Sequence, residues 1–202
     1  MLGLPEPRVL DRIRKTWRED RKPANVLLVV DVSGSMNDQN RLVRAKEGLK
    51  TFLREVSPND RLGLMIFSDR VQPLIPIGEC RAELAPLVDR LIADGGTAVY
   101  NATAQAIEIV KNLRDKERIN AVVVLTDGED TDSSLTADEV VRRAGGQGDS
   151  ADKVRVFTIA YSAGAEGAAD ALKRISQASG GQAYTGDTDD IETVYRSISS
   201  FF

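Results

Sequence analysis

Apolar residues follow two different spacings along the chain, and their alternation predicts strands joined by helices. Continuous runs rich in β-branched residues, at 26–30 and 121–125, are typical of parallel strands buried on both faces. Further strands are predicted at 62–67, 154–161 and 182–185. Apolar residues at helical spacing predict amphipathic helices at 8–20, 40–56, 82–92, 98–113, 137–144 and 168–178, followed by a closing helix after Asp187.

The segment 71–77 differs from the other predicted strands. It alternates apolar with other residues and contains Pro73 and Pro76, which cannot donate hydrogen bonds to a neighbouring strand. Because only a short turn separates it from 62–67, we expect an antiparallel hairpin at an edge. The order of elements predicts an α/β fold: a doubly wound, mostly parallel central sheet of about six strands, with one antiparallel edge strand and helices on both faces.

Two of the predicted helices have apolar stripes that we expect to be buried. On the helix at 40–56 the stripe comprises Leu42, Val43, Leu49, Phe52, Leu53 and Val56. On the closing helix it comprises Ile191, Val194, Tyr195, Ile198, Phe201 and Phe202. The acids Asp187, Asp189 and Asp190 precede that helix, where carboxylates suit the positive end of the helix dipole.

Oxygen-bearing side chains follow two of the buried strands and one glycine loop. Asp31, Ser33 and Ser35 come directly after the first strand, Asp127 follows 121–125, and Thr97 follows two glycines that let the backbone approach an ion closely. The carboxyl ends of central strands are where open α/β sheets bind ligands. Two carboxylates with three hydroxyls suit Mg²⁺, Mn²⁺ or Ca²⁺ and not Zn²⁺ or copper, and the chain has no His.

These residues resemble the metal-ion-dependent adhesion site of the von Willebrand factor A family, whose signature is Asp-x-Ser-x-Ser with a distant Thr and Asp. The resemblance implies that Ser33, Ser35 and Thr97 are direct ligands of Mg²⁺. It also implies that Asp31 and Asp127 hold the ion through carboxylates or bound waters. One coordination place would remain open for an Asp or Glu carboxylate of a protein partner.

Each motif also has a purely structural interpretation. The Asp-x-Ser-x-Ser segment could cap the next helix, and Thr97 could cap the helix that begins near Ala98. The three segments together, each after a predicted strand or loop end, favour the metal site. Asp38 could lie above the ion, although a residue just past the motif is more often solvated.

The loop after Asp127 adds three carboxylates, Glu129, Asp130 and Asp132. They could form a second cation site at the rim of the first. We favour a solvated acidic loop in which Asp132 or a neighbouring serine prepares the next helix. In either case their negative potential would oppose a partner carboxylate unless the partner also brings basic residues.

Three classes of function fit these motifs. The favoured one is a non-enzymatic adhesion or adaptor module that binds a protein partner through the ion. A Mg²⁺-dependent hydrolase or phosphotransferase is the alternative, but phosphotransferases with an aspartyl nucleophile carry a second acid where Ser33 stands, and without His no proton shuttle is apparent. A structural domain with a vestigial site is the third.

Composition narrows the remaining choices. With 27 Lys and Arg against 31 Asp and Glu, the formal charge is −4 and nucleic-acid binding has little support. The single cysteine, Cys80, cannot form an internal disulfide. The chain contains no run of about 18 apolar residues, so we do not expect this segment to insert into a membrane. We expect a linker and helix at 1–23 and one domain at 24–202, monomeric as a module.

The family resemblance leaves the location of the protein open. The opening from Asn25 to Met36 and the segment from Leu125 to Asp130 look like bacterial members of the family. Some of those members are modules of exported, membrane-anchored proteins, and others are cytoplasmic adaptors. The chain could therefore be a fragment of a longer extracytoplasmic protein or a cytoplasmic one.

Overall fold

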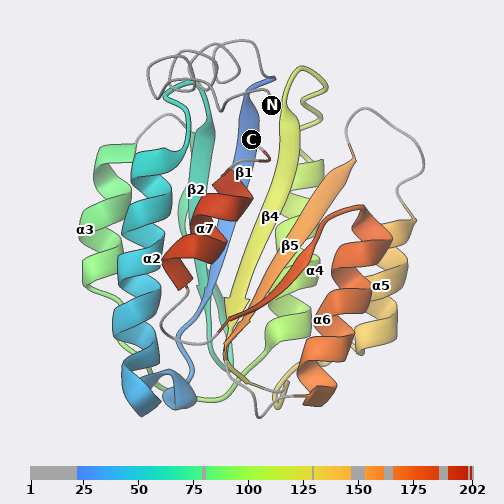
Figure 1. The fold of residues 1–202 in the computed structure, drawn as a ribbon. Helices are drawn as coiled ribbons and strands as arrows, with labels where there is room; N and C mark the ends of the chain where they lie inside the picture. The colour runs from blue at the N-terminus through green and yellow to red at the C-terminus, as the bar shows by residue number, and fades with distance from the viewer. Residues whose placement is uncertain are drawn as a thin grey trace, which may run out of the picture.

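The computed structural model describes residues 22–78, 81–128, 130–146, 153–161, 166–186, 191–199 and 201. A six-stranded sheet lies at its centre, in the order β3-β2-β1-β4-β5-β6 (Figure 1). The strands are β1 (Ala24–Asp31), β2 (Arg61–Phe67), β3 (Val71–Gly78), β4 (Ile119–Thr126), β5 (Val154–Tyr161) and β6 (Ala183–Gly186). The predicted helix at 8–20, Cys80, Glu129 and the acids before the closing helix lie outside the described residues.

Two layers of helices cover the sheet. The helical elements are η1 (Gly34–Asn40), α2 (Arg41–Glu55), η2 (Arg81–Glu83), α3 (Leu84–Asp89), α4 (Val99–Lys111), α5 (Ala137–Gly145), α6 (Glu166–Ser179) and α7 (Ile191–Ser199). One core cluster joins the sheet to α2, α3 and α7, and a second joins it to α4, α5 and α6 (Figure 1). The predicted doubly wound α/β fold is therefore confirmed.

The strand β1 shows why an uninterrupted apolar run was needed at the centre. Successive side chains of a strand point to opposite faces, so Val26 and Leu28 enter one core cluster while Leu27 and Val29 enter the other. Parallel pairing with β2 on one side and β4 on the other leaves no edge of β1 free. Its end at Asp31 is thereby fixed next to the end of β4.

The antiparallel edge strand is also confirmed. β3 pairs antiparallel with β2, whereas β1–β2, β1–β4, β4–β5 and β5–β6 are parallel. Pro73 and Pro76 lie in this edge strand, where a missing N–H can be tolerated. The helix α6 ends at Ser179, before Gly180 with a φ of +73°, a backbone conformation in which glycine commonly ends helices.

Three details of the predicted helices were wrong. Val43 is 52% exposed, because the buried stripe of α2 passes through Leu42, Ala45 and Leu49 and leaves the adjacent position outside it. Phe201 is 42% exposed, since α7 ends at Ser199 and helical spacing no longer applies, although its ring lies 5.3 Å from that of Phe157. The helix predicted to reach residue 92 ends at Asp89.

The chain from residue 90 to 98 instead crosses the carboxyl ends of the central strands as a loop, at the bottom of Figure 1. It links α3 on one face of the sheet to α4 on the other. This loop carries Thr97 to the ends of β1 and β4. Within the described part of the chain, no helix combines the length and apolar character of a membrane span.

Candidate metal centre

The structure brings the five oxygen-bearing residues together at the carboxyl ends of β1 and β4. The Ser33 and Ser35 hydroxyl oxygens lie 3.1 Å apart, and the Ser35 hydroxyl donates to Asp127 Oδ1 at 2.8 Å. A Cβ atom at Gly128 would lie 3.7 Å from Ser35 Oγ and 4.0 Å from Thr97 Oγ1. Of the five oxygen-bearing residues, Ser35 is half-buried and the other four are buried.

Backbone hydrogen bonds hold the loop that carries Thr97 against the end of β1. The Gly34 N–H donates to the Gly95 carbonyl at 2.9 Å, and the Asp94 N–H donates to the Val32 carbonyl at 2.8 Å. Gly95 has a φ of +86°, a conformation that a residue with a Cβ rarely adopts. The glycine is therefore needed where the loop turns toward the strand end.

Asp31 is a fully buried carboxyl whose hydrogen-bond donors among the described residues, Ser33 and Thr126, are neutral. Burial raises the pKa of the Asp31 carboxyl from its ordinary 3.8 to about 6, although hydrogen bonds from Ser33 and Thr126 oppose the shift. Ser33 N–H donates to Oδ1 at 2.8 Å, and the Thr126 hydroxyl donates to Oδ2. A buried carboxylate in this position would be stabilised by a bound cation.

Asp127 has a cationic partner that the sequence analysis missed. Arg41 Nη1 lies 2.7 Å from Asp127 Oδ2, and the Arg41 side chain is only 14% exposed. The same nitrogen donates more weakly to the Ser35 carbonyl, at 3.5 Å. Arg41 is the first residue of α2, where a positive charge opposes the helix dipole. The sequence shows only that unfavourable placement and not the partner, which lies 86 residues away.

The donor set could hold a hard divalent cation. It comprises two carboxylates and three hydroxyls, which match the oxygen preference of Mg²⁺, Mn²⁺ and Ca²⁺. A site built from three or more His, Cys, Asp or Glu side chains is a different kind, and none is found among the residues that the structure describes. Two carboxylates and the Arg41 guanidinium leave this site with a formal charge of −1.

Neither structural interpretation of the motifs matches the helix ends. Ser33 occupies the N-cap position of η1, but its side chain makes no capping hydrogen bond. The N-cap of α4 is Ala98 and not Thr97. The hydroxyls of Ser33 and Thr97 are thus not used for capping these helices.

The acidic loop after Asp127 binds the start of α4. Asp132 Oδ2 accepts from the Thr97 N–H at 3.0 Å, and Asp130 Oδ1 accepts from the Tyr100 N–H at 3.3 Å. Ser133 Oγ accepts from the Asn101 N–H at 3.0 Å. The first turn of α4 is therefore capped by side chains about thirty residues away in sequence.

The expectation that Asp132, Ser133 or Ser134 prepares the next helix was wrong. Thr136 caps α5 in a capping box with Glu139, since the Thr136 hydroxyl accepts from the Glu139 N–H and the Glu139 carboxylate accepts from the Thr136 N–H. This signature is present in the sequence and could have been found there.

Asp38 lies exposed in η1.

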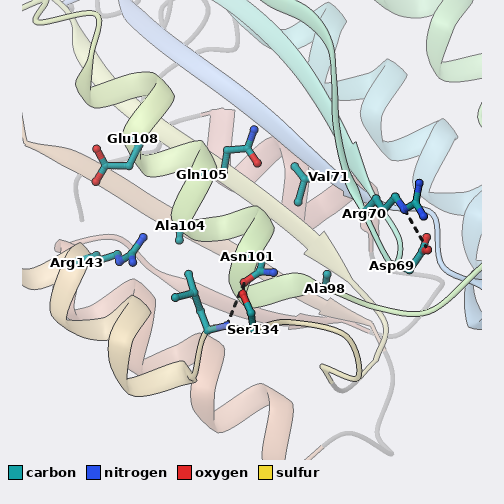
Figure 2. A pocket seen from close by; sticks show the side chains of 11 residues that line it. Asp69, Arg70, Val71, Ala98, Asn101, Ala104, Gln105, Glu108, Ser134 and Arg143 are labelled. Carbon is teal, nitrogen blue, oxygen red and sulfur yellow. Dashed lines mark hydrogen bonds and ion pairs between the residues drawn. The ribbon is translucent and has the colours of Figure 1, made fainter.

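Two hollows flank the turn between β2 and β3. The larger, of about 600 Å³, runs along α4 between this turn and α5, and Figure 2 shows Asn101, Gln105 and Glu108 of α4 facing it. The smaller, of about 300 Å³, lies between the turn and the loop at 91–96. Asp69 and Arg70 line both hollows.

The family model of the von Willebrand factor type A (VWA) domain matches residues 26–129, which is just over half of the chain. The chain belongs to the VWA domain family. The matched range contains β1 from its third residue onward, β2, β3 and β4, together with the five oxygen-bearing residues. Domains of this family are generally protein-interaction or adhesion modules.

Curated relatives contain a similar VWA segment within much longer chains. Inter-alpha-trypsin inhibitor heavy chain H1 of Mesocricetus auratus is 28% identical over 128 residues, which cover 58% of this chain and 14% of that protein. An uncharacterized protein of Synechocystis sp. is 35% identical over 112 residues, which cover 54% of this chain and 26% of that protein. The matched VWA segment is thus only a small part of each relative.

Solved structures share the VWA fold over most of this chain. A von Willebrand factor type A protein from Catenulispora acidiphila superposes with a TM-score of 0.71 at 23% identity, covering 88% of this chain and 42% of that one. BatB from Bacteroides thetaiotaomicron superposes with a TM-score of 0.69 at 19% identity, covering 88% and 96%. At these identities the likeness concerns the fold alone.

Proposed function

We propose that this VWA domain is a non-catalytic module that binds a protein partner through a divalent metal ion. The residues that would hold Mg²⁺ are Asp31, Ser33, Ser35, Thr97 and Asp127, and Mn²⁺ or Ca²⁺ could replace Mg²⁺. The partner would supply an Asp or Glu carboxylate. The observation that carries the proposal is the cluster of hydroxyls and carboxylates at the ends of two adjacent central strands, with 2.8 Å between Ser35 Oγ and Asp127 Oδ1.

The charge of the site supports capture of an anion. A bound dication supplies a Lewis-acidic centre, and the hydroxyls of Ser33, Ser35 and Thr97 add no charge to it. Arg41 neutralises one of the two carboxylates through Asp127 Oδ2. A dication held by a net charge of −1 keeps a net positive charge, which favours an incoming carboxylate.

The surroundings of the two serines argue against a hydrolase. A serine nucleophile needs a base that accepts its proton, and the chain contains no His. The Ser35 hydroxyl does donate to a carboxylate, that of Asp127. However, that carboxylate is already engaged in an ion pair, since Arg41 Nη1 lies 2.7 Å from Asp127 Oδ2.

Thermal unfolding tests the metal site directly. An ion that binds only the folded chain raises its stability by about 3 kcal/mol at a hundredfold excess over its dissociation constant. We expect Mg²⁺ to raise the melting temperature of the wild type above its value in EDTA. Asp31→Ala should abolish this rise. Mn²⁺ and Ca²⁺ are compared in the same way.

The matched control removes an exposed acid at the opposite end of the sheet. Glu117→Ala, in the loop before β4, changes the net charge equally and should retain the full rise with Mg²⁺. A wild type that does not respond to any of the three ions, or an Asp31→Ala variant that responds as fully as the wild type, would contradict the proposal.

A further inference from the structure

An exposed isoleucine stands on the loop that crosses the metal-binding edge. Ile92 is 81% exposed, while its neighbours Leu91 and Ala93 are buried. The Asn37 side-chain amide donates to the Ala93 carbonyl at 3.1 Å, and the Asp94 N–H donates to Val32. On the preceding side, the Leu91 N–H donates to the Val88 carbonyl at 3.3 Å. The backbone is therefore held on both sides of Ile92, whose side chain is exposed.

Ile92 forms one wall of the 300 Å³ hollow. Val32, Ile66 and Phe67 supply the other apolar contacts of this hollow. Val32 lies between Asp31 and Ser33 in the sequence, so the hollow borders the segment of backbone that carries these two residues. The 600 Å³ hollow on the other side of the turn is lined mostly by polar side chains (Figure 2).

We propose that this hollow receives an aliphatic or aromatic side chain of the protein partner, close in sequence to the carboxylate that binds the metal. The inference rests on the proposed function. Neighbouring residues of an extended segment are about 3.3 Å apart, so one segment can place an acid on the ion and an apolar side chain against Ile92. Contact with an exposed isoleucine removes apolar surface from water and strengthens binding.

Charges at the rim of the hollow add a second preference. Asp69 and Asp94 are exposed there, and Arg70 is the one basic residue in its lining. Arg70 Nε lies 3.8 Å from Asp69 Oδ2, an ion pair drawn in Figure 2. Because Arg70 offsets the charge of Asp69, the lining keeps one net negative charge, that of Asp94. A partner segment should therefore carry a basic residue beside its acid and its apolar side chain.

Selection from a library of random linear peptides tests this inference. The Mg²⁺-loaded protein is immobilised, and bound peptides are eluted with EDTA and sequenced. We expect the enriched peptides to contain Asp or Glu with Ile, Leu, Val or Phe within two positions. The same selection on Ile92→Ser should lose the apolar preference, and peptides selected on the wild type should bind this variant about tenfold more weakly.

Leu113→Ser is the matched control, because Leu113 is an exposed aliphatic residue just beyond α4, at the far end of that helix from Thr97. It should retain both the preference and the affinity. The rise in melting temperature with Mg²⁺ is measured for each variant, so that loss of metal is recognised.

Three results would overturn the inference in different ways. Acidic peptides without an apolar preference, or an equal preference on Ile92→Ser, would overturn the apolar contact and leave the metal-dependent capture intact. Absence of any EDTA-eluted peptide on the wild type would overturn the proposed function and the inference with it.

Discussion

The Arg41 guanidinium offsets part of the negative charge of the candidate metal-binding oxygens. It pairs with Asp127 Oδ2 at 2.7 Å, while Asp127 Oδ1 accepts from Ser35. Its Nε is buried and has no hydrogen-bond partner among the described residues, so the guanidinium is directed at the site rather than used in a wider network. Arg41 would thus act on a bound ion through Asp127.

Replacing Arg41 should therefore have opposite effects on the ion and on its ligand. In Arg41→Gln, loss of a nearby positive charge should tighten Mg²⁺ binding about tenfold, as measured by isothermal titration calorimetry. Capture of acidic peptides should weaken, because the ion then carries less net positive charge. Arg41→Lys should behave more like the wild type.

Lys111→Gln removes an equal charge at the end of α4 and serves as the control, with Mg²⁺ affinity unchanged. Weaker Mg²⁺ binding by Arg41→Gln than by the wild type would show that Arg41 supports the site only by holding its shape.

The acidic loop and α4 form one structural unit. Thr97 illustrates this, since its N–H donates to Thr131 and Asp132 side chains while its carbonyl accepts from the backbone N–H groups of the same two residues. Gly96 lies so close that a Cβ atom there would be 1.9 Å from Asp132 Oδ2. The loop after β4 thereby fixes the position of Thr97.

Asp132→Ala should destabilise the fold by about 1 kcal/mol, the usual contribution of a helix cap, as measured by urea unfolding in EDTA. The number of Mg²⁺ ions bound, measured by calorimetry, should equal that of the wild type. Glu117→Ala is again the control, without loss of stability. Loss of a bound ion in Asp132→Ala would instead identify Asp132 as a ligand of a second cation.

Local patterns predicted most of the elements because their causes are local. The apolar run at 26–30 forms a strand whose two faces must both be covered by helices. Pro73 and Pro76 lack a backbone N–H and therefore suit a strand at the edge of the sheet. The cap of α4 depends on Asp130 and Ser133, which meet the helix only after β4 has entered the sheet. The same holds for Arg41 and Asp127, which are 86 residues apart. No spacing in the sequence encodes such tertiary contacts.

The stability of the whole metal-free molecule should depend on pH through Asp31. Its folded pKa of about 6 lies above the ordinary 3.8, so between these values the folded chain holds a proton that the unfolded chain has released. The free energy of unfolding in EDTA should therefore fall as pH rises from about 4 to about 6, by up to roughly 3 kcal/mol. Above about pH 6 the loss is complete.

Urea unfolding of the wild type and Asp31→Asn in EDTA, at about pH 5 and about pH 8, checks this expectation. The variant should lose less stability than the wild type between the two values, because its buried amide does not ionise. Excess Mg²⁺ should restore the free energy of unfolding of the wild type at the higher pH and leave that of the variant unchanged. Equal losses in both proteins would show that Asp31 is not the group responsible.

The position of the oxygen cluster has a mechanical consequence. It sits on β1 and β4, which are hydrogen-bonded to each other, and each is also bonded to another parallel strand, β2 or β5. Traction on a partner held at this edge would pull along both strands and load their flanking ladders in shear. Many backbone hydrogen bonds would then have to break at the same time, so the partner should dissociate before the sheet unfolds.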